Sequence, residues 1–328
     1  MNEQTEKKKR LLSGVKPTGR PHVGNYLGAM RQFVELQSDH ESFFMIADYH
    51  ALTTLHDPLT LRTDTLGVAM DYLAIGLDPK KAVIFKQSDV PAHTEAAWIF
   101  SCITTMPFLM RAHAFKDAEV KNKEISVGTF EYPMLMAADI ILYDTDVVPV
   151  GKDQEQHVEI ARDTAQKFNR LFGETFIVPS AKILPETAVV PGTDGQKMSK
   201  SYKNTIPLFA EKDEIAAAVM SIVTDSSGVG DTKDPARDTV FALHRFFSPR
   251  EKDEIEKRYR AGSIGHQESK KILIENIDAF VAPARERRRE IEKDPSSVVR
   301  VLTEGAERAR EVTEKKMQEV RERIGVRG

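Results

Sequence analysis

From Leu11 to about Ile206, short apolar runs alternate with longer stretches in which apolar residues recur at helical spacing. The runs RLLSGV, SFFMIADYH, KAVIFKQSDV and VVPVG have the length and character of buried strands. Stretches such as PLTLRTDTLGVAMDYLAIG and AHTEAAWIFSCITT have the character of helices. Strands that alternate with helices in this way pair as a parallel sheet. The pattern therefore predicts an α/β fold with a doubly wound parallel sheet.

After Ile206 the strand pattern stops, and charged helical patterns follow, interrupted by the loop-forming stretch TDSSGVGDTKDPARDT. The sequence thus predicts a flexible tail over residues 1–9 and an α/β domain over residues 10–206. A short inserted segment is expected at about residues 104–130. An all-helical domain is expected over residues 207–328, with its last helix packing back on the α/β domain.

Composition excludes several classes of protein. A hydrophobic content of 41% and a charged content of 30% are typical of a soluble globular protein, and no run of about 18 apolar residues is present. The first ten residues lack the apolar segment of a signal peptide. A single cysteine, Cys102, excludes an internal disulfide and any multi-cysteine zinc or iron–sulfur site. We therefore expect a cytoplasmic protein without a membrane span, a zinc ion or an iron–sulfur cluster.

The stretch PTGRPHVGNYLGAM, residues 17–30, places turn-forming residues between an apolar run and a helical pattern. This is the layout of a phosphate-binding corner between a strand and a helix. His22 can donate a hydrogen bond to a phosphate oxygen, and Gly24 lets a ring or a phosphate approach the backbone. Asn25 offers both a helix cap and a donor. The alternative is a turn with a capping asparagine and a surface histidine.

A second stretch, DGQKMSKSYKNT, places Lys197 and Lys200 in a loop between the two predicted domains. Two ammonium groups, with the hydroxyls of Ser199 and Ser201, suit a mobile clamp on the charge that develops on a pyrophosphate. The alternative is a basic linker.

Together, His-x-Gly-Asn and Lys-Met-Ser-Lys-Ser resemble the signature pair of the class I aminoacyl-tRNA synthetases, which lies on a Rossmann-type domain. Asn25 stands where the fourth residue is often histidine, a variation of the tryptophan and tyrosine branch. The resemblance implies that an amino acid attacks the α-phosphate of Mg²⁺-ATP and that the aminoacyl-adenylate then esterifies the 3′-terminal ribose of a tRNA. It also implies catalytic roles for His22, Asn25, Lys197 and Lys200.

Residues 131–169 (EYPMLMAADIILYDTDVVPVGKDQEQHVEIARDTAQKFN) resemble tryptophanyl-tRNA synthetases at nearly every position. An indole offers a flat apolar body and one N–H that can only donate, so its pocket needs a buried acceptor. Tyr132, Met136 and Asp139 share one helical face. Asp139 would accept the indole N–H and Met136 would pack on the ring, although Met136 alone is also typical of ordinary core packing.

The strand that follows would complete the pocket. Val148 and Val150 alternate along it, so they face the same way and could form the floor. By the resemblance, Gln154 would engage the amino group of the substrate, and His50 matches a histidine of the family's pocket. The alternative for His50 is a core histidine with its hydrogen bonds satisfied.

The same resemblance places a larger set of residues at ATP, namely Lys16, Pro17, Thr18, Gly24, Asn25, Gly151, Lys152, Asp153, Val190, Lys197, Met198, Ser199, Lys200 and Ser201. Lys16 stands where the family usually has glutamine. Lys116 matches a lysine that reaches a phosphate in the family, and its alternative is an ordinary surface lysine.

The resemblance therefore implies a tryptophan–tRNA ligase that uses tryptophan, ATP with Mg²⁺ and tRNA(Trp), forms a homodimer and reads the anticodon with its helical domain. The arginines at positions 285 and 287–289 are candidates for RNA contact or for a solvated helix face. Three other functions remain open: tyrosine–tRNA ligase, a non-catalytic paralogue that binds tRNA or tryptophan, and an enzyme that adenylates another small molecule.

Overall fold

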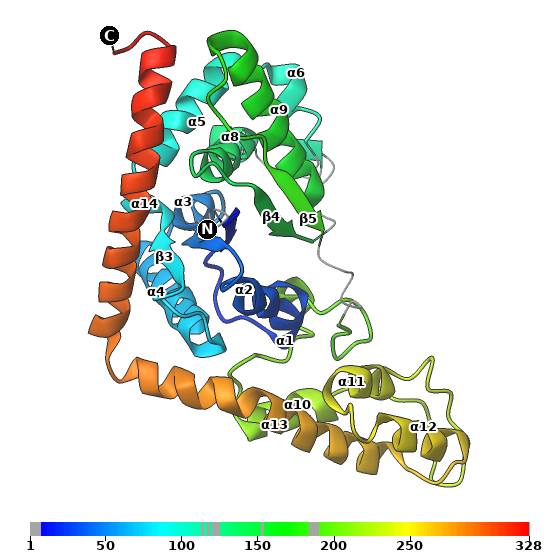
Figure 1. Cartoon of the computed structure of the whole chain (residues 1–328). Coiled ribbons are helices and arrows are strands. Elements are labelled where there is room, and N and C mark those ends of the chain that lie inside the picture. Colours follow the sequence, from blue (N-terminus) through cyan, green and yellow to red (C-terminus); the bar gives the residue numbers. More distant parts are fainter. Residues whose placement is uncertain are drawn as a thin grey trace, which may run out of the picture. The chain divides into compact units, whose positions relative to one another are not determined.

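The computed structural model describes residues 8–112, 115–116, 119, 125–151, 154–183 and 190–327 (Figure 1). It divides into two compact units that are not continuous in sequence. The first, which we call the sheet unit, comprises Met1–Gly19, Gln32–Pro185 and Asp294–Gly328. The second, the helical unit, comprises Arg20–Arg31 and Glu186–Lys293. The boundary between residues 206 and 207 stays a prediction about functional domains.

The sheet unit is built on five parallel strands. In chain order they are β1 (Arg10–Val15), β2 (Glu41–Ile46), β3 (Ala82–Lys86), β4 (Val147–Val150) and β5 (Ser180–Ile183). Their order in the sheet is β3-β2-β1-β4-β5, so the chain reverses its direction of growth between β1 and β4. In such sheets ligands bind at the carboxyl ends of the strands, next to this switch point. The prediction of a doubly wound parallel sheet is confirmed.

Helices surround this sheet. They are α2 (Arg31–Leu36, beginning one residue before the unit's boundary), α3 (Asp48–Ala51), α4 (Pro58–Ile75), α5 (Ala92–Ile103), α6 (Met106–Leu109), α8 (Val127–Ile141), α9 (Glu155–Phe172) and α14 (Pro295–Arg323), with the 3₁₀ turn η2 (Gln87–Asp89). One of the long predicted helices of this unit, α4, has the expected end signals. Asp57 accepts a hydrogen bond from the Thr60 N–H, Pro58 is the first helical residue, and Gly76 ends the helix with a φ of 107°.

The helical unit contains no strand among its described residues, as the pattern after Ile206 predicts. Its elements are α1 (Val23–Asn25), the π-helical turn η1 (Tyr26–Met30), the 3₁₀ turn η4 (Lys200–Tyr202), α10 (Lys212–Met220), α11 (Thr239–Phe247), α12 (Lys252–Arg260) and α13 (His266–Glu292). Within the stretches that the structure describes, no helix is both long enough and apolar enough to cross a membrane.

β5 is the strand of this sheet that the sequence pattern missed. It has four residues, of which only Ala181 is partly shielded from solvent, because β5 forms an edge of the sheet. An exposed edge strand this short has no run of apolar residues to predict it.

The last helix, α14, packs against β3 and also contacts α4 and α5 (Figure 1). The closest approach is at Gly305, where an added methyl group would lie 1.9 Å from the backbone oxygen of Ile84. Backbone cannot withdraw as a flexible side chain can, so only glycine lets the helix lie this close to the strand. The position of α14 on the sheet unit therefore depends on one missing Cβ.

We expect Gly305→Ala to lower the free energy of unfolding by about 3 kcal/mol, because the added methyl overlaps the backbone of β3. The matched control is Gly67→Ala in α4, where an added methyl meets no atom within 4 Å. That control should raise stability by about 0.5–1 kcal/mol through helix propensity. Scanning calorimetry of both variants measures the difference, and a Gly305→Ala protein as stable as the wild type would refute the close approach.

Candidate active site

The corner at His22 is organised by reciprocal hydrogen bonds at the start of α1. The Asn25 N–H donates to Nδ1 of His22 over 3.2 Å, and the His22 N–H donates to Oδ1 of Asn25 over 3.1 Å. Both residues thus act as a capping box. The ring of His22 is buried, with 6% of the residue exposed. The corner is therefore a fixed structure and the histidine is not a surface residue.

Two effects keep His22 neutral. Burial is the main one and the charge of Lys200 is the second, and together they lower the pKa of His22 from 6.5 to about 4. Since Nδ1 accepts from Asn25, the proton of the neutral ring is on Nε2. His22 is thus prepared as a neutral hydrogen-bond donor with a fixed tautomer, which suits the role that the sequence predicts for it.

Gly24 lies against the ring of His22 and close to Met198. A methyl group on Gly24 would lie 2.9 Å from Nδ1 of His22 and 3.4 Å from Cβ of Met198. The helical unit therefore brings the first predicted motif and the lysine motif into contact. The space beside Gly24 is used by the protein's own histidine, which is a reason for the glycine that the sequence alone does not reveal.

The lysine motif is a loop held from beneath by Asn204. This residue is 2% exposed; its Nδ2 donates to Oδ1 of Asp194 and to the Lys197 carbonyl, and its Oδ1 accepts from the Ser199 N–H. Met198 is buried, and its N–H donates to the carbonyl of Val190 over 3.0 Å. Val190 thus supports the loop through its backbone. Sequence reasoning missed Asn204, although it lies only three residues after the motif.

The contacts of Asn204, Met198 and Val190 hold the loop in place but leave its charged side chains at the surface of the protein. Lys197, Lys200 and Ser201 are exposed, and Ser199 is half-buried. A loop with a buried methionine and ammonium groups at its surface is suited to contact an anion without being rebuilt. The roles of these residues at ATP stay predictions.

We expect the role of His22 as a hydrogen-bond donor to be unaffected by ionisation of its ring between pH 5 and 8. Its pKa of about 4 lies below that range, so the ring keeps its Nε2 proton throughout. His22→Ala should lower kcat about 10²-fold, while His22→Gln, whose amide is also a neutral donor, should lose less. The measurement is the pH profile of kcat for each protein. An inflection near pH 6.5 that disappears in His22→Gln would contradict the assignment.

The lowered pKa of His22 also makes the free energy of unfolding depend on pH. The unfolded chain takes up this proton near pH 6.5 and the folded chain near pH 4. His22 therefore favours unfolding increasingly as the pH falls through this window.

In the sheet unit the central residue is Asp139, on α8. It is 2% exposed. Its carboxylate forms hydrogen bonds with side chains from three other elements: His50 on α3, Gln87 on η2 and His93 on α5. These elements follow the carboxyl ends of β2 and β3. The predicted buried acceptor therefore exists, at the edge of the sheet formed by the carboxyl ends of its strands, and it has partners within the protein.

Asp139 is ionised at every physiological pH. Burial alone would raise its pKa, but the hydrogen bonds from His50 and His93 and the charges of both rings outweigh burial and lower the pKa to about 2. An ionised carboxylate only accepts, so both histidines donate to it. Nε2 of His93 lies 2.8 Å from the hydroxyl of Tyr143, whose pKa is raised, chiefly by burial and also by Asp139.

Gln87, His93 and Tyr143 are residues that sequence reasoning missed. Gln87 and His93 lie 52 and 46 residues from Asp139 along the chain, so spacing on one helix could not connect them. A usable signal was present for Gln87, because the KAVIFKQSDV run that contains it has polar residues near its end, as SFFMIADYH does.

The other residues predicted for tryptophan are placed as follows. Tyr132 and Met136 are on α8 with Asp139, and the hydroxyl of Tyr132 lies 3.0 Å from Nε2 of His157. Val148, on β4, is buried, and Val150 at the end of β4 is half-buried against the same core. Gln154 precedes α9. Their contacts with a substrate stay predictions.

The predicted ATP residues of the sheet unit flank the switch point. Lys16, Pro17 and Thr18 follow β1, and Gly151 follows β4. The ammonium of Lys16 donates to Thr53 and Thr54 over 2.9 and 3.1 Å, and burial lowers its pKa.

Lys116 is exposed, which is compatible with an ordinary surface lysine as well as with its predicted role. Lys152 and Asp153 lie outside the described residues.

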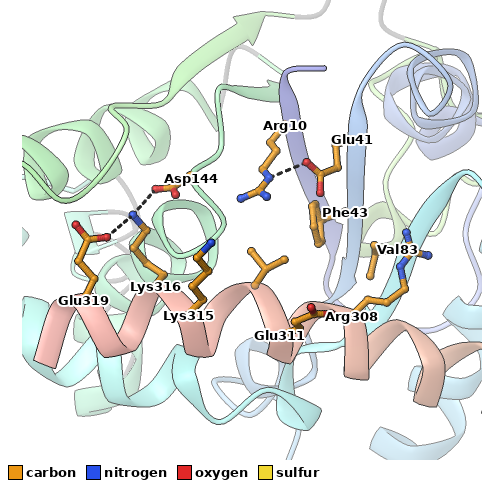
Figure 2. Close-up of a pocket in the computed structure, with 11 residues that line it drawn as sticks. Arg10, Glu41, Phe43, Val83, Asp144, Arg308, Glu311, Lys315, Lys316 and Glu319 are labelled. Carbon is orange, nitrogen blue, oxygen red and sulfur yellow. Dashed lines mark hydrogen bonds and ion pairs between the residues drawn. The ribbon is translucent and has the colours of Figure 1, made fainter. Parts of the chain in front are cut away.

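A separate cavity of about 650 Å³ lies where α14 crosses the amino ends of β1 and β2 (Figure 2). Its lining residues are Arg10, Glu41, Phe43, Val83, Asp144, Arg308, Glu311, Val312, Lys315, Lys316 and Glu319. Arg10 pairs with Glu41 over 2.8 Å, and Lys316 pairs with Asp144 and Glu319. Because this is the opposite end of the sheet from the predicted residues, the cavity does not belong to the candidate site.

Comparison with known proteins agrees with this geometry. The family of "tRNA synthetases class I (W and Y)" matches residues 4–282. The chain belongs to this family. Within it, the chain is 50% identical over 319 residues to a tryptophan–tRNA ligase of Rhodopirellula baltica, covering 97% of this chain and 100% of that protein. It is 47% identical over 321 residues to a tryptophan–tRNA ligase of Fusobacterium nucleatum, covering 98% of this chain and 99% of that protein.

A solved structure of the family resembles the whole chain. It is the tryptophanyl-tRNA synthetase of Campylobacter jejuni complexed with ADP and tryptophan, with a TM-score of 0.91 and 44% identity over 96% of this chain and 99% of that one. The sequence-based resemblance to class I synthetases is therefore confirmed.

Proposed function

We infer that this synthetase is a tryptophan–tRNA ligase. The observation that carries the inference is the identity of 44–50% along nearly the full length of both chains to proteins of that name. The buried carboxylate of Asp139 supports the choice of amino acid, because an indole N–H requires an acceptor and nothing else polar. No observation favours tyrosine, so tyrosine enters as an outcome of the test.

In the first step, a carboxylate oxygen of tryptophan attacks the α-phosphorus of ATP, the bond from that phosphorus to the bridging oxygen breaks, and pyrophosphate leaves with the electron pair. Negative charge therefore grows on the leaving group. We assign its stabilisation to the ammonium groups of Lys197 and Lys200 and to the Nε2–H of His22. Mg²⁺ enters as part of the substrate, bound to the phosphates of ATP.

The remaining predicted residues take binding roles in this proposal. Tyr132, Met136, Val148, Val150 and Gln154 would surround tryptophan. Lys16, Gly24, Gly151 and the loop around Ser199 would bind ATP, as would Pro17, Thr18, Asn25, Lys152, Asp153, Val190, Met198 and Ser201, with Lys116 at a phosphate. The ammonium of Lys16 is held by neutral hydroxyls, which supports a role in which it meets an anionic substrate oxygen.

In the second step, a hydroxyl of the 3′-terminal ribose of tRNA(Trp) attacks the carbonyl carbon of tryptophanyl-adenylate, and AMP leaves. We propose that the helical unit reads the anticodon, whose unstacked bases are open to side chains. The arginine cluster of α13 gives this only weak support. Arg285 pairs with Asp278, Arg288 with Glu292 and Arg289 with Glu286, which is typical of a solvated helix face.

We further propose that the enzyme acts in the cytoplasm as a symmetric homodimer. Light scattering coupled to size-exclusion chromatography tests the second part directly. A mass about twice that of one chain is expected, and a mass near 36.9 kDa, that of a single chain, would contradict it.

The test of the function is ATP–pyrophosphate exchange measured with each of the twenty amino acids in turn. Exchange should depend on tryptophan. Exchange with tyrosine alone would assign the sibling activity. Binding of tryptophan without exchange would indicate a non-catalytic paralogue, and exchange without subsequent charging of any tRNA would indicate a different adenylating enzyme.

A further inference from the structure

The acceptor capacity of Asp139 is fully used by the protein itself. Its Oδ1 accepts from Nε2 of Gln87 over 2.7 Å and from Nδ1 of His93 over 2.5 Å. Its Oδ2 accepts from Nε2 of His50 over 2.8 Å and from Nε2 of Gln87 over 3.0 Å. A carboxylate has about four lone-pair directions. These four contacts occupy them.

This occupancy conflicts with the arrival of a further donor. If Asp139 accepts the indole N–H of tryptophan, as the proposed function requires, one of the present donors must leave. A buried donor that lost its acceptor would be costly, and so would a buried carboxylate with a bare lone pair. The donor that leaves must therefore be one that can reach another environment.

Gln87 and His93 cannot leave easily. Both are fully buried at 0% exposure. The amide of Gln87 contacts both oxygens of Asp139, and His93 is held at its other nitrogen by Tyr143. Moving either side chain would disturb the core beneath the sheet's edge.

His50 differs from them in position and exposure. It lies on α3, a helix of only four residues that follows β2, and its side chain is 13% exposed. Its ring meets Tyr132, one of the residues predicted to surround the substrate, edge to face with centroids 6.1 Å apart. His50 is therefore the donor that borders both Asp139 and the predicted pocket.

We propose that His50 is an exchangeable donor: its Nε2–H donates to Oδ2 of Asp139 until tryptophan binds, and it then gives way to the indole N–H of tryptophan. Gln87 and His93 remain as fixed donors. The number of hydrogen bonds to the buried carboxylate is then the same before and after binding. The proposal rests on the proposed function, and it explains how the site would select tryptophan over ligands of similar shape that lack the N–H donor.

The exchange rejects ligands that lack a donor. A tryptophan analogue with sulfur in place of the indole N–H, 3-benzothienylalanine, has nearly the same shape. It would displace His50 without replacing the bond, which leaves Oδ2 bare. Rejection then comes from the lost hydrogen bond and needs no steric clash.

The experiment compares His50→Leu with the wild type by isothermal titration calorimetry and by thermal unfolding, with and without saturating tryptophan. The empty variant should unfold at a lower temperature, because Oδ2 has lost its donor. The variant should bind tryptophan about tenfold more tightly, since no bond is broken on binding, and a factor of ten is the weight of one strong hydrogen bond. The two saturated proteins should then differ less in Tm than the two empty ones.

The matched control is His56→Leu, an exposed histidine a few residues further on whose Nε2 lies 3.0 Å from the Leu52 carbonyl. It should leave the Kd for tryptophan unchanged. A merely structural role for His50 would weaken tryptophan binding or leave it unchanged, and either result overturns the proposal.

A second measurement does not depend on a variant. In the wild type, the ring nitrogens of His50 are observed by ¹⁵N NMR during titration with tryptophan. The signal of a hydrogen-bonded Nε2–H should be lost on saturation, while the signals of His93 persist. An unchanged His50 signal overturns the proposal.

The outcomes separate this inference from the proposed function. If the wild type neither binds tryptophan nor supports exchange, the function fails and the inference fails with it. If the wild type binds tryptophan and supports exchange but His50 keeps its bond, only the inference fails.

Discussion

Asp139→Asn is expected to lower kcat/KM for tryptophan in pyrophosphate exchange by about 10⁴-fold, the discrimination typical of a buried polar group left without its partner. The amide replaces one acceptor oxygen by a donor, which would face His93, Gln87 or His50, all of which donate to the carboxylate. The same mismatch should lower the free energy of unfolding by about 3–5 kcal/mol. The measurement is exchange at low temperature as a function of tryptophan concentration, with folding checked by circular dichroism.

The control for this variant is Asp163→Asn, which removes a carboxylate from an exposed position on α9 of the same unit. It should change neither exchange nor Tm. Binding of ATP alone separates the two effects of Asp139→Asn, since a folded variant should keep it. A folded variant that keeps wild-type kinetics with tryptophan would remove Asp139 from the binding site and leave it a role in the core only.

The sequence was sufficient for the parts of the fold that depend on local pattern. Apolar runs and helical spacing predict β1 to β4 and the long helices α4, α5 and α8 between them, because each of these buried elements has its own periodic signal. The edge strand β5 lacks that signal, since its side chains are mostly exposed. The close contact of α14 with β3 depends on Gly305, and a single glycine in a helical pattern has no distinctive local meaning.

The candidate site shows the same division. Motif letters single out His22, Lys197, Lys200 and Asp139, and helical spacing predicts that Asp139 shares a face of α8 with its neighbours Tyr132 and Met136. The donors to Asp139 come from other elements, and only the order of strands in the sheet brings them together. The tautomer of His22 likewise required geometry, because it depends on which ring nitrogen accepts from Asn25.

Asn204 illustrates why a motif is an incomplete description of a loop. Five residues of the motif carry the predicted chemistry, but a buried amide outside them joins its backbone at Ser199 and Lys197 to Asp194. Gly192 must lack a Cβ because that amide lies 2.3 Å from where the Cβ would be. The loop's shape is therefore set by residues whose side chains have no part in the proposed reaction.

Replacing both lysines of this loop, Lys197→Ala with Lys200→Ala, should lower kcat for adenylate formation by about 10³-fold or more. Both side chains lie at the surface of an anchored loop, so they can meet an anion without unfolding of that loop. Removing one group that stabilises developing charge typically costs about 10²–10³-fold. The KM for tryptophan should change little, because no residue proposed to surround tryptophan belongs to this loop. Single-turnover measurement of tryptophanyl-adenylate formation gives kcat for the chemical step.

The matched control is Lys203→Asn, which removes the same charge from the same loop. Lys203 has a φ of 54°, and asparagine tolerates this left-handed conformation better than most residues, so the loop should keep its shape. If the double variant raised the KM for ATP and left kcat unchanged, the lysines would bind ATP equally well before and during the reaction. In that case the two lysines would contribute only to the binding of ATP. The stabilisation of the leaving pyrophosphate would then have to come from His22 and Mg²⁺ alone.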